Sequence, residues 1–388
     1  MHVLVLPSSF PNADFPVHGI FYQQQALALH NAGIKIGVIV PDIYQFKYLL
    51  NSKLLRKSFI TYTDESCPFP VFRKSGFNIL PLFSFFQKFI FRKYAKQLFQ
   101  QYINKYGTPD IIHAHTSVWA GYTACVISKK TGIPVILTEH SSGLARNLFD
   151  KWQRKSMAYA VNNSSSIIAV SDKLKNDIQK YYPTAKEISV IPNIINVSRF
   201  KLDQNSFYNR HKLVTVANLN QNKGIDILIK AFKIASEKLP ELTLTIAGDG
   251  DQKQNLIILA KSFNLENKIQ FTGSLPPEEI AALFNNSGLF VSSSYFETFG
   301  VAIAEALSCG LPVVVTKSGG PEEFVNPGNG LLCNPGDPQE LADCILTVIS
   351  KYSTFVPEQI RQEIINRFGP EIIVQQLQKQ YDSSCKMC

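Results

Sequence analysis

The chain has 388 residues, 45% of them hydrophobic, and a formal net charge of +9, which is typical of a water-soluble protein with two domains. It has no apolar run of about 18 residues and no basic segment leading into a long apolar one at its start, so we expect neither a transmembrane helix nor a signal peptide. Its seven scattered cysteines indicate reduced thiols in a cytoplasmic protein rather than a disulfide framework.

The chain opens with a pattern of strand, loop, helix and strand. His2–Leu6 and Ile34–Val40 are predicted strands, and Ile20–His30 is the helix between them. This order is typical of the start of a parallel α/β sheet. Gly19, just before the helix, can let a phosphate approach the backbone; the alternative is a simple turn glycine.

Residues 44–105 interrupt this alternation of strands and helices. They hold eleven Lys/Arg and two Asp/Glu, mixed with aromatic residues. Read as a helix, Phe83–Lys93 would have an apolar part and a strongly basic part, which favours contact with an anionic membrane surface. The alternative is a core helix with a solvated basic face. Nucleic acid is not an expected partner, because no nucleic-acid-binding motif accompanies the charge.

Two further predicted strands, 110–115 and 133–140, run into His115 and His140. Ligands of open parallel sheets bind beyond the carboxyl ends of the strands, so we expect both histidines to lie at a ligand site near the loop before Gly19. The alternative for each is a structural hydrogen bond. No histidine here has the spacing of zinc ligands, so no metal is predicted.

A domain boundary is predicted near residues 193–205, where helical periodicity is lost and the charge balance changes sign. We therefore expect an N-terminal acceptor-side domain over 1–195 and a nucleotide-sugar-binding domain over 196–368. A C-terminal helix and tail over 369–388 can pack back on the first domain.

Two loops of the second domain contain candidate phosphate or ribose contacts. Lys223 precedes the predicted helix Ile225–Lys238, where an ammonium group can meet a phosphate; a solvated surface lysine is the alternative. Gly248 follows the predicted strand Leu242–Ala247 and forms either a structural turn or a contact to a base or ribose.

The stretch Ser292–Gly310 is the most informative part of the sequence. A buried strand and a polar loop lead to a helix that is predicted to start at Phe299-Gly300-Val301. The amides of its first turn and the helix dipole favour an anion. Glu297 and Glu305 would repel a phosphate, so we expect them to bind hydroxyl groups instead. Together these features predict a nucleotide-linked sugar as the ligand.

The order of motifs resembles retaining glycosyltransferase family 4, over nearly the whole chain. The strongest part runs from Glu297 to Gly320. Supporting motifs are Lys223-Gly224, Gly248-Asp249-Gly250, Pro192-Asn193 with Arg199-Phe200, His113-Ala114-His115, Thr138-Glu139-His140 and Asn329-Gly330-Leu331-Leu332. The resemblance implies an α/β protein with the GT-B fold, in which two Rossmann-like domains face each other across a cleft.

The resemblance also implies a role for each candidate residue. Catalysis would rest on Glu297, His115 and Lys223; donor binding on Gly19, Asn218, Lys223, Gly248, Phe299, Gly300, Val301 and Glu305; and the acceptor side on His140 and His18. Glu305 would bind the donor ribose, and Glu297 would lie beside the transferred sugar. Substitution would occur at the front face with retention, and without a metal or other cofactor, because Lys223 and the helix amides stabilise the diphosphate.

One position departs from the family pattern. The family usually has an arginine five residues before the lysine, and this chain has Asn218 there. An asparagine can donate a hydrogen bond but cannot neutralise a diphosphate. Either Arg199 or Lys317 replaces the missing cation, or the activity is lower than is usual in the family.

The expected function is transfer of a hexose from a nucleotide-diphosphate sugar, UDP-sugars being favoured, to a hydroxyl of a membrane-linked or polysaccharide acceptor in surface glycan biosynthesis. We expect a cytoplasmic protein that is peripheral on the inner face of the cytoplasmic membrane. The alternatives are a degenerate nucleotide-sugar-binding scaffold, a nucleotide-sugar epimerase with the same fold, and a nicotinamide dehydrogenase. The last is disfavoured because no G-x-G-x-x-G follows a predicted strand.

Overall fold

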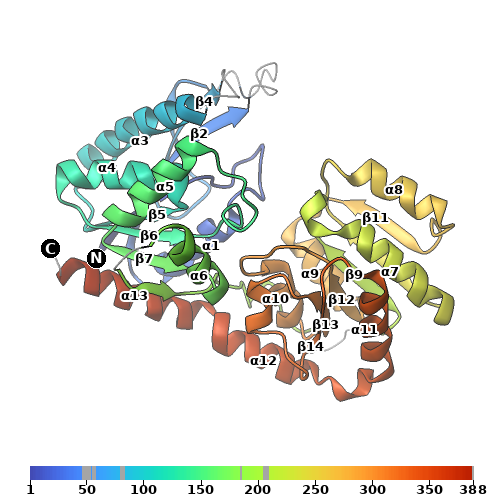
Figure 1. Cartoon of the computed structure of the whole chain (residues 1–388). Helices are drawn as coiled ribbons and strands as arrows, with labels where there is room; N and C mark the ends of the chain where they lie inside the picture. Colours follow the sequence, from blue (N-terminus) through green and yellow to red (C-terminus); the bar gives the residue numbers. More distant parts are fainter. Residues whose placement is uncertain (46–53, 55–57, 79–83, 184–185, 204–208, 387–388) are drawn as a thin grey trace. The chain divides into compact units, whose positions relative to one another are not determined.

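The computed structural model describes residues 1–388 apart from 46–53, 55–57, 79–83, 184–185, 204–208 and 387–388 (Figure 1). The chain divides into two compact units: unit 1 comprises Met1–Ile194 and Ile373–Cys388, and unit 2 comprises Ile195–Ile372. Each unit has its own sheet, covered by helices. In the described part of the chain, no helix is both long and apolar enough to cross a membrane.

The sheet of unit 1 has the strand order β3-β4-β2-β1-β5-β6-β7-β8. Its described strand pairs are parallel, except that β3 is antiparallel to β4. The strands are β1 (His2–Pro7), β2 (Lys35–Gln45), β3 (Thr61–Asp64), β4 (Val71–Asn78), β5 (Ile111–His115), β6 (Val135–Glu139), β7 (Ser166–Ala169) and β8 (Ile188–Val190). The predicted strands at the start of the chain and before both histidines are confirmed.

Helices pack on both faces of this sheet. They are α1 (Ile20–Asn31), α3 (Ser84–Tyr106), α4 (Tyr122–Thr131), α5 (Lys151–Asn163), α6 (Asp172–Tyr181) and α13 (Pro370–Lys386). Val38 of β2 lies in the core cluster that α1 and α13 cover. Its neighbour Gly37 faces the ring of Tyr102 on α3, because successive side chains of a strand point to opposite faces. The α3 layer and the α13 helix therefore lie on opposite sides of the sheet (Figure 1).

Unit 2 has a parallel sheet in the order β11-β10-β9-β12-β13-β14. Its strands are β9 (Lys212–Val216), β10 (Thr243–Ala247), β11 (Ile269–Gly273), β12 (Leu289–Ser292), β13 (Val313–Thr316) and β14 (Gly330–Cys333). Its α-helices are α7 (Ile225–Lys238), α8 (Lys253–Ser262), α9 (Pro277–Asn285), α10 (Val301–Ser308), α11 (Pro338–Ser350) and α12 (Pro357–Phe368). The predicted bounds of α7 are confirmed, and so is a helix start at Val301.

Unit 1 differs from the sequence-based prediction in several places, and strands β3 and β4, within residues 44–105, were not predicted. The segment after β5 begins as a π-helical turn, Ser117–Gly121, before it continues as α4. Helix α5 was not predicted; a capping box between Asp150 and Gln153 marks its start. The expected basic helix of Phe83–Lys93 continues to Tyr106 as α3, because apolar residues that face the sheet recur along its second half.

Candidate active site

In unit 2, the candidate residues gather at the carboxyl edge of the sheet. Strands β9 and β12 are neighbours, while the strand that follows β9 in sequence, β10, lies on its other side. The order of the strands reverses here, and such a switch point is where open α/β sheets bind ligands. The loops after β9, β12 and β13 contain Lys223, Glu297 and Gly319 respectively.

Backbone contacts tie the first two of these loops together. Tyr295 N donates to Asn222 O at 2.8 Å, and Ser293 Oγ donates to Lys223 O at 2.9 Å. Gly224 adopts φ 58°, and a Cβ at this position would lie 2.3 Å from Ser293 O. Only glycine fits such a left-handed position so close to another chain segment. The entrance of α7, with Lys223, is therefore fixed against the loop after β12.

Lys223 and Glu297 form an ion pair at the centre of this arrangement. Lys223 Nζ lies 2.5 Å from Glu297 Oε1, and Ser294 Oγ donates to the same oxygen at 2.9 Å. The Glu297 backbone also joins the third loop, since its N–H donates to Ser318 O and its C=O accepts from Gly320 N. The side chains are 23% and 17% exposed, so each can still be reached by a ligand. Sequence reasoning proposed both residues but not their pairing.

Helix α10 starts directly after Glu297, as predicted. Phe299 is buried against the rings of Phe324 and Phe368, which fixes the start of the helix. Gly300 is the N-cap, with φ 94°. Ile303 N and Ala304 N donate to Gly300 O, both at 3.1 Å. The N–H groups of Val301 and Ala302, which come before them, have no acceptor within a helix, so this end of α10 can bind an anion.

Glu305 lies one turn further along α10 and is partly buried. Burial raises the pKa of its carboxyl group to about 8, and the positive charge of Arg199 opposes this shift. The guanidinium of Arg199 also pairs with Glu278, with Nε and Oε1 3.1 Å apart. The carboxyl is therefore largely protonated at neutral pH without a ligand. Hydrogen bonds from ribose hydroxyls would replace some of the hydrogen bonds to water that burial removes.

The remaining donor-side candidates are placed as follows. Asn218 is exposed at the end of β9, and its C=O accepts from Asn220 N. Gly248 has φ 143° and lies so close to Ala217 O that a Cβ would be 1.8 Å away. Its N–H donates to Gly273 O, so that amide is already used within the protein. Lys317 is exposed, with its Nζ 3.5 Å from Asn334 Oδ1.

We predict that Glu305 makes the unliganded protein less stable as the pH rises from 7 to 8. Its folded-state pKa of about 8 exceeds the ordinary value of 4.5, so the native state holds the proton that the unfolded state has lost. One such group lowers the melting temperature by at most about 2–4 °C per pH unit. His113, His140 and Asp42 titrate below this window. Melting curves of Glu305→Gln should lack this part of the slope, and an unchanged slope would contradict the prediction.

In unit 1, His115 and His140 lie side by side at the ends of β5 and β6. His115 Nδ1 and His140 Nε2 are 3.0 Å apart, and the rings of Tyr22 and Phe21 from α1 pack on them. Burial lowers the pKa of His140 to about 3 and that of His115 well below its ordinary value. Both are therefore neutral at pH 7 and can donate or accept hydrogen bonds, but they cannot supply a positive charge.

Two residues that sequence reasoning did not single out support this cluster. The carboxylate of Glu139 accepts from Ser117 N at 2.8 Å and from His140 N and Ser141 N at 2.9 Å. His113 stacks on His115 and is 2.8 Å from the hydroxyl of Tyr381 on α13. Both residues lie in the two motifs quoted above, Thr138-Glu139-His140 and His113-Ala114-His115, but their roles depend on contacts with residues distant in sequence.

Gly19 and His18 lie in the loop that follows β1. Gly19 is the N-cap of α1 with φ 71°, and a Cβ there would lie 2.6 Å from Ser9 O. His18 is exposed and stacks on Phe15 with ring centroids 5.0 Å apart. The structure therefore gives Gly19 a conformational reason to be glycine and leaves the His18 ring partly free for a ligand.

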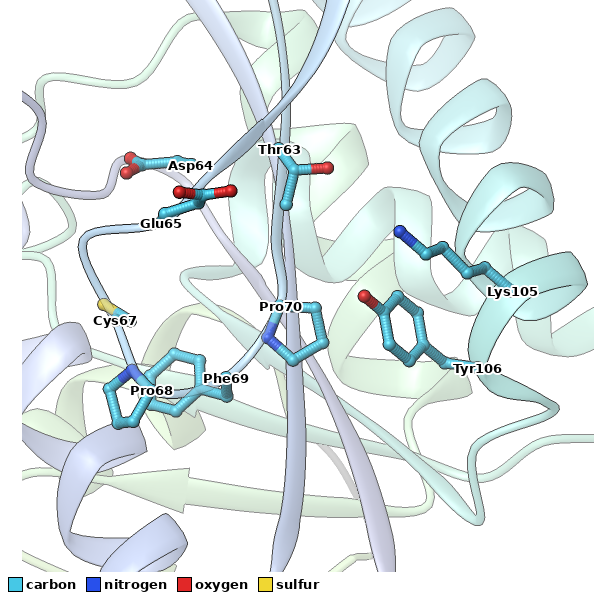
Figure 2. Close-up of a pocket in the computed structure, with 9 residues that line it drawn as sticks. All are labelled: Thr63, Asp64, Glu65, Cys67, Pro68, Phe69, Pro70, Lys105 and Tyr106. Atoms are coloured by element: carbon cyan, nitrogen blue, oxygen red, sulfur yellow. The ribbon is translucent and has the colours of Figure 1, made fainter.

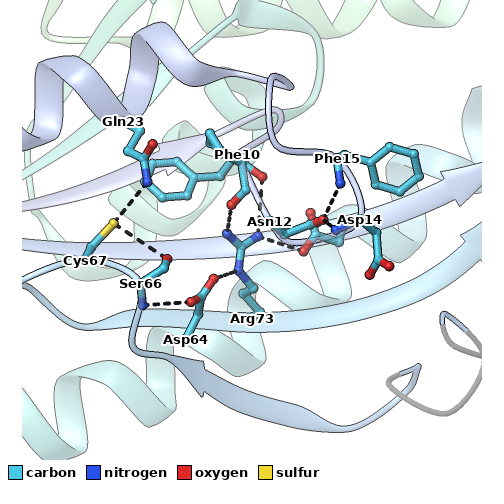
Figure 3. A network of polar contacts seen from close by, with 11 residues as sticks. Phe10, Asn12, Asp14, Phe15, Gln23, Asp64, Ser66, Cys67 and Arg73 are labelled. Carbon is cyan, nitrogen blue, oxygen red and sulfur yellow. Dashed lines mark hydrogen bonds and ion pairs between the residues drawn. The ribbon is translucent and has the colours of Figure 1, made fainter. Parts of the chain in front are cut away.

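Arg73 anchors this loop from β4 (Figure 3). It is fully buried, with ion pairs to Asp42 at 3.0 Å and Asp64 at 2.6 Å. Its guanidinium also donates to the carbonyl oxygens of Phe10 and Pro11. Arg73 is one of the eleven basic residues of 44–105, the segment expected to meet an anionic membrane surface. It cannot contribute to that surface, because its side chain is inside the protein. Lys47, Lys53, Arg56 and Lys57 lie outside the described residues.

A hollow of about 350 Å³ lies beside this network (Figure 2). It is lined by Thr63, Asp64, Glu65, Cys67, Pro68, Phe69, Pro70, Lys105 and Tyr106. None of the candidate site residues lines it, so we do not assign it to the active site. Among the described residues, no three His, Cys, Asp or Glu side chains are arranged to hold a metal ion.

Two family models match this chain. One, described as Glycosyltransferase Family 4, matches residues 21–199, and the other, Glycosyl transferases group 1, matches residues 198–367. The putative teichuronic acid biosynthesis glycosyltransferase TuaC of Bacillus subtilis is 27% identical, over 89% of this chain and 88% of its own length.

Other relatives are matched over part of their length. The gpi3 subunit of Schizosaccharomyces pombe phosphatidylinositol N-acetylglucosaminyltransferase is 25% identical over 71% of this chain. A human phosphatidylinositol N-acetylglucosaminyltransferase subunit is 29% identical over 58% of this chain. The matches span 61% and 47% of these two relatives.

Solved structures resemble the whole chain. Sucrose-phosphate synthase of Thermosynechococcus elongatus superposes with a TM-score of 0.82 at 20% identity, over 100% of both chains. HepE of Anabaena, solved in complex with UDP and glucose, gives a TM-score of 0.75 at 24% identity, over 99% of this chain and 100% of its own. These likenesses confirm the predicted fold class, an α/β protein with two Rossmann-like domains of the GT-B type.

Proposed function

The chain belongs to glycosyltransferase family 4, and on this premise we propose that it is a retaining hexosyltransferase. The donor is a nucleotide-diphosphate sugar, most simply a UDP-sugar, and the acceptor is a hydroxyl of a membrane-linked or polysaccharide glycan. The observation that carries the proposal is the pairing of Lys223 with Glu297 at the switch point of unit 2, beside the first turn of α10.

The geometry suggests how the donor would be held. Its diphosphate would lie against the N-terminal amides of α10 and draw Lys223 away from Glu297. Glu297, released from the ammonium group, would accept hydrogen bonds from hydroxyls of the sugar. Glu305 would do the same for the ribose. The leaving diphosphate would then assist deprotonation of the acceptor on the same face of the sugar, which retains the anomeric configuration.

The missing cation at Asn218 is a feature of this proposal. Arg199 is held by Glu278 and lies close enough to influence the pKa of Glu305, while Lys317 is on the exposed loop after β13. We propose that Arg199 supplies part of the lost positive charge near the ribose end. Lys223 would then be the main cation for the phosphates, and no metal ion would be needed.

Unit 1 would provide the acceptor side. His140 is partly exposed, whereas His115 is buried beneath Tyr22, so His140 is the better placed to reach an acceptor hydroxyl. His115 would orient it through their hydrogen bond. The relative named for teichuronic acid biosynthesis supports a surface glycan as the product class. We propose that this protein works on such an acceptor as a peripheral enzyme at the inner face of the cytoplasmic membrane.

A thermal-shift panel of UDP-, GDP- and ADP-sugars tests the donor. At 100 times its dissociation constant, the right donor stabilises the folded state by about 2.7 kcal/mol, which corresponds to roughly 5–10 °C. We expect this shift with a UDP-sugar and a smaller one in Glu305→Gln. No shift with any of the three would contradict the proposal. Binding without transfer to any acceptor would favour a scaffold, and release of an epimer without acceptor would favour an epimerase.

A further inference from the structure

Three helices of unit 1 form a layer that contains many cations and no carboxylates. Helices α3, α4 and α5 contact one another on the face of the sheet opposite α13 (Figure 1). None of them contains Asp or Glu. Their ten basic residues are Lys88, Arg92, Lys93, Lys96, Lys105, Lys129, Lys130, Lys151, Arg154 and Lys155. We call this surface the basic helical layer.

No carboxylate among the described residues forms an ion pair with any of these ten cations. Asp150, just before α5, is engaged as the helix cap by Trp152 N and Gln153 N. Lys105 lines the hollow that also contains Asp64 and Glu65, so its charge is partly offset. The other nine cations of the three helices produce a positive field that an anionic partner would relieve.

Aromatic side chains lie exposed at one end of the layer. Phe85 is 53% exposed, Phe89 47% and Trp152 44%, and the Phe85 and Trp152 rings are 5.8 Å apart although they come from α3 and α5. Lys88 Nζ lies within 6 Å of both ring centroids, and Lys155 Nζ is 5.5 Å from that of Trp152. Leu148, 58% exposed, precedes α5.

The combination of many cations with exposed apolar side chains indicates that the partner is an anionic lipid surface. Exposed Phe and Leu side chains gain free energy by leaving water, and Trp favours the boundary between lipid headgroups and acyl chains. The surrounding ammonium groups would meet lipid phosphates at the same depth. A nucleic acid would satisfy the cations and could stack on the rings, but it would leave Leu148 exposed to water.

We propose that the basic helical layer docks on an anionic phospholipid bilayer, with Phe85, Phe89 and Trp152 entering the interface. This extends the segment expected from sequence, residues 44–105, to α4 and α5, and it excludes the buried Arg73. The inference rests on the proposed function only in that a membrane-linked acceptor would lie at the same surface.

Vesicle sedimentation with the full chain tests this inference. Vesicles of phosphatidylcholine with 30% phosphatidylglycerol are compared with vesicles of phosphatidylcholine alone. The test variant reverses three exposed lysines of the layer, Lys93→Glu, Lys151→Glu and Lys155→Glu. A matched control reverses three exposed lysines of unit 2, Lys238→Glu, Lys261→Glu and Lys351→Glu, so the change in net charge is the same.

We expect the test variant to lower the partition coefficient on anionic vesicles at least ~100-fold and the control variant to lower it far less. The double variant Phe85→Ser, Trp152→Ser should weaken the binding that persists in high salt. Equal binding to both vesicle types, or equal loss in both charge variants, would overturn the inference. The inference would also be overturned if the protein bound a single-stranded oligonucleotide more tightly than anionic vesicles and if added vesicles could not displace the oligonucleotide.

The same samples separate this inference from the proposed function. Each variant is also tested for the thermal shift with a UDP-sugar, which should match that of the unmodified chain. The expected donor residues other than Gly19 lie in unit 2, and Gly19 is not part of the basic helical layer. Selective vesicle binding without any nucleotide-sugar shift would contradict the function and leave the docking surface supported. A normal thermal shift without selective vesicle binding would contradict the docking surface and leave the proposed function supported.

Discussion

Replacing Lys223 with alanine should reduce turnover by at least ~100-fold, the usual effect of losing one contact that stabilises charge in a transition state. The diphosphate leaves with more negative charge than it has in the bound donor, so a cation at this point contributes more to the transition state than to binding. Because Asn218 removes the second cation that the family pattern supplies, little else in the loop can compensate. We therefore expect kcat to fall more than the donor KM rises.

Lys230→Ala is the matched control for this prediction. Lys230 lies on α7, the helix that follows Lys223, and its side chain is 42% exposed and pairs with Asp226 along the helix. Its loss should therefore leave turnover unchanged. Removing Lys223 also leaves Glu297 without its ion-pair partner, so the melting temperature of each variant should be measured beside its kinetics. Near-normal turnover in a folded Lys223→Ala protein would refute the assignment.

The fold of unit 2 was largely predictable from its sequence. Several of its helices begin beside a glycine or a proline, as α7 does after Gly224 and α11 does at Pro338, and bury one apolar side. The glycines were informative because they mark backbone positions that admit no side chain, such as Gly224 against Ser293 O. The helix boundaries depend mainly on neighbouring residues, whereas the reason why Gly224 must be glycine lies in a distant loop.

Contacts between distant residues could not be predicted in the same way. Lys223 and Glu297 are separated by 74 residues, and each was proposed for its own loop. Only the order of strands in the sheet, which places β9 beside β12, brings the two loops together. The hydrogen bond between His115 and His140 depends likewise on the pairing of β5 with β6.

The burial of individual side chains could not be predicted from the local composition either. Arg73 looks like a surface cation in a basic segment, yet it is buried, because two acidic residues from β2 and β3 reach it. Helix α5 was missed for the opposite reason, since its charged and polar residues outweigh the four that it buries. In both cases the surrounding strands and helices, rather than the local sequence, decide the environment.

Arg73→Ala should destabilise unit 1 by about 3–5 kcal/mol, because it leaves Asp42 buried without its cation. The backbone carbonyls of Phe10 and Pro11 would also lose their donor, and the loop that leads to Gly19 would lose its anchor (Figure 3). Urea or thermal unfolding followed by circular dichroism measures the loss. Melting of unit 2, monitored through its stabilisation by a UDP-sugar, should change much less.

A second variant shows whether the buried charge is the cause. In Arg73→Met with Asp42→Asn, the more deeply buried Asp42 no longer carries a charge, and Asp64, which is 17% exposed, is the carboxylate that still loses its cation. Much of the stability should therefore return even though both ion pairs are gone. If the double variant is as unstable as Arg73→Ala, the loss comes from packing or from the loop carbonyls instead. A loss below about 1 kcal/mol in Arg73→Ala would mean that water or a neighbouring group replaces the guanidinium, and that the loop after β1 is held by its other contacts.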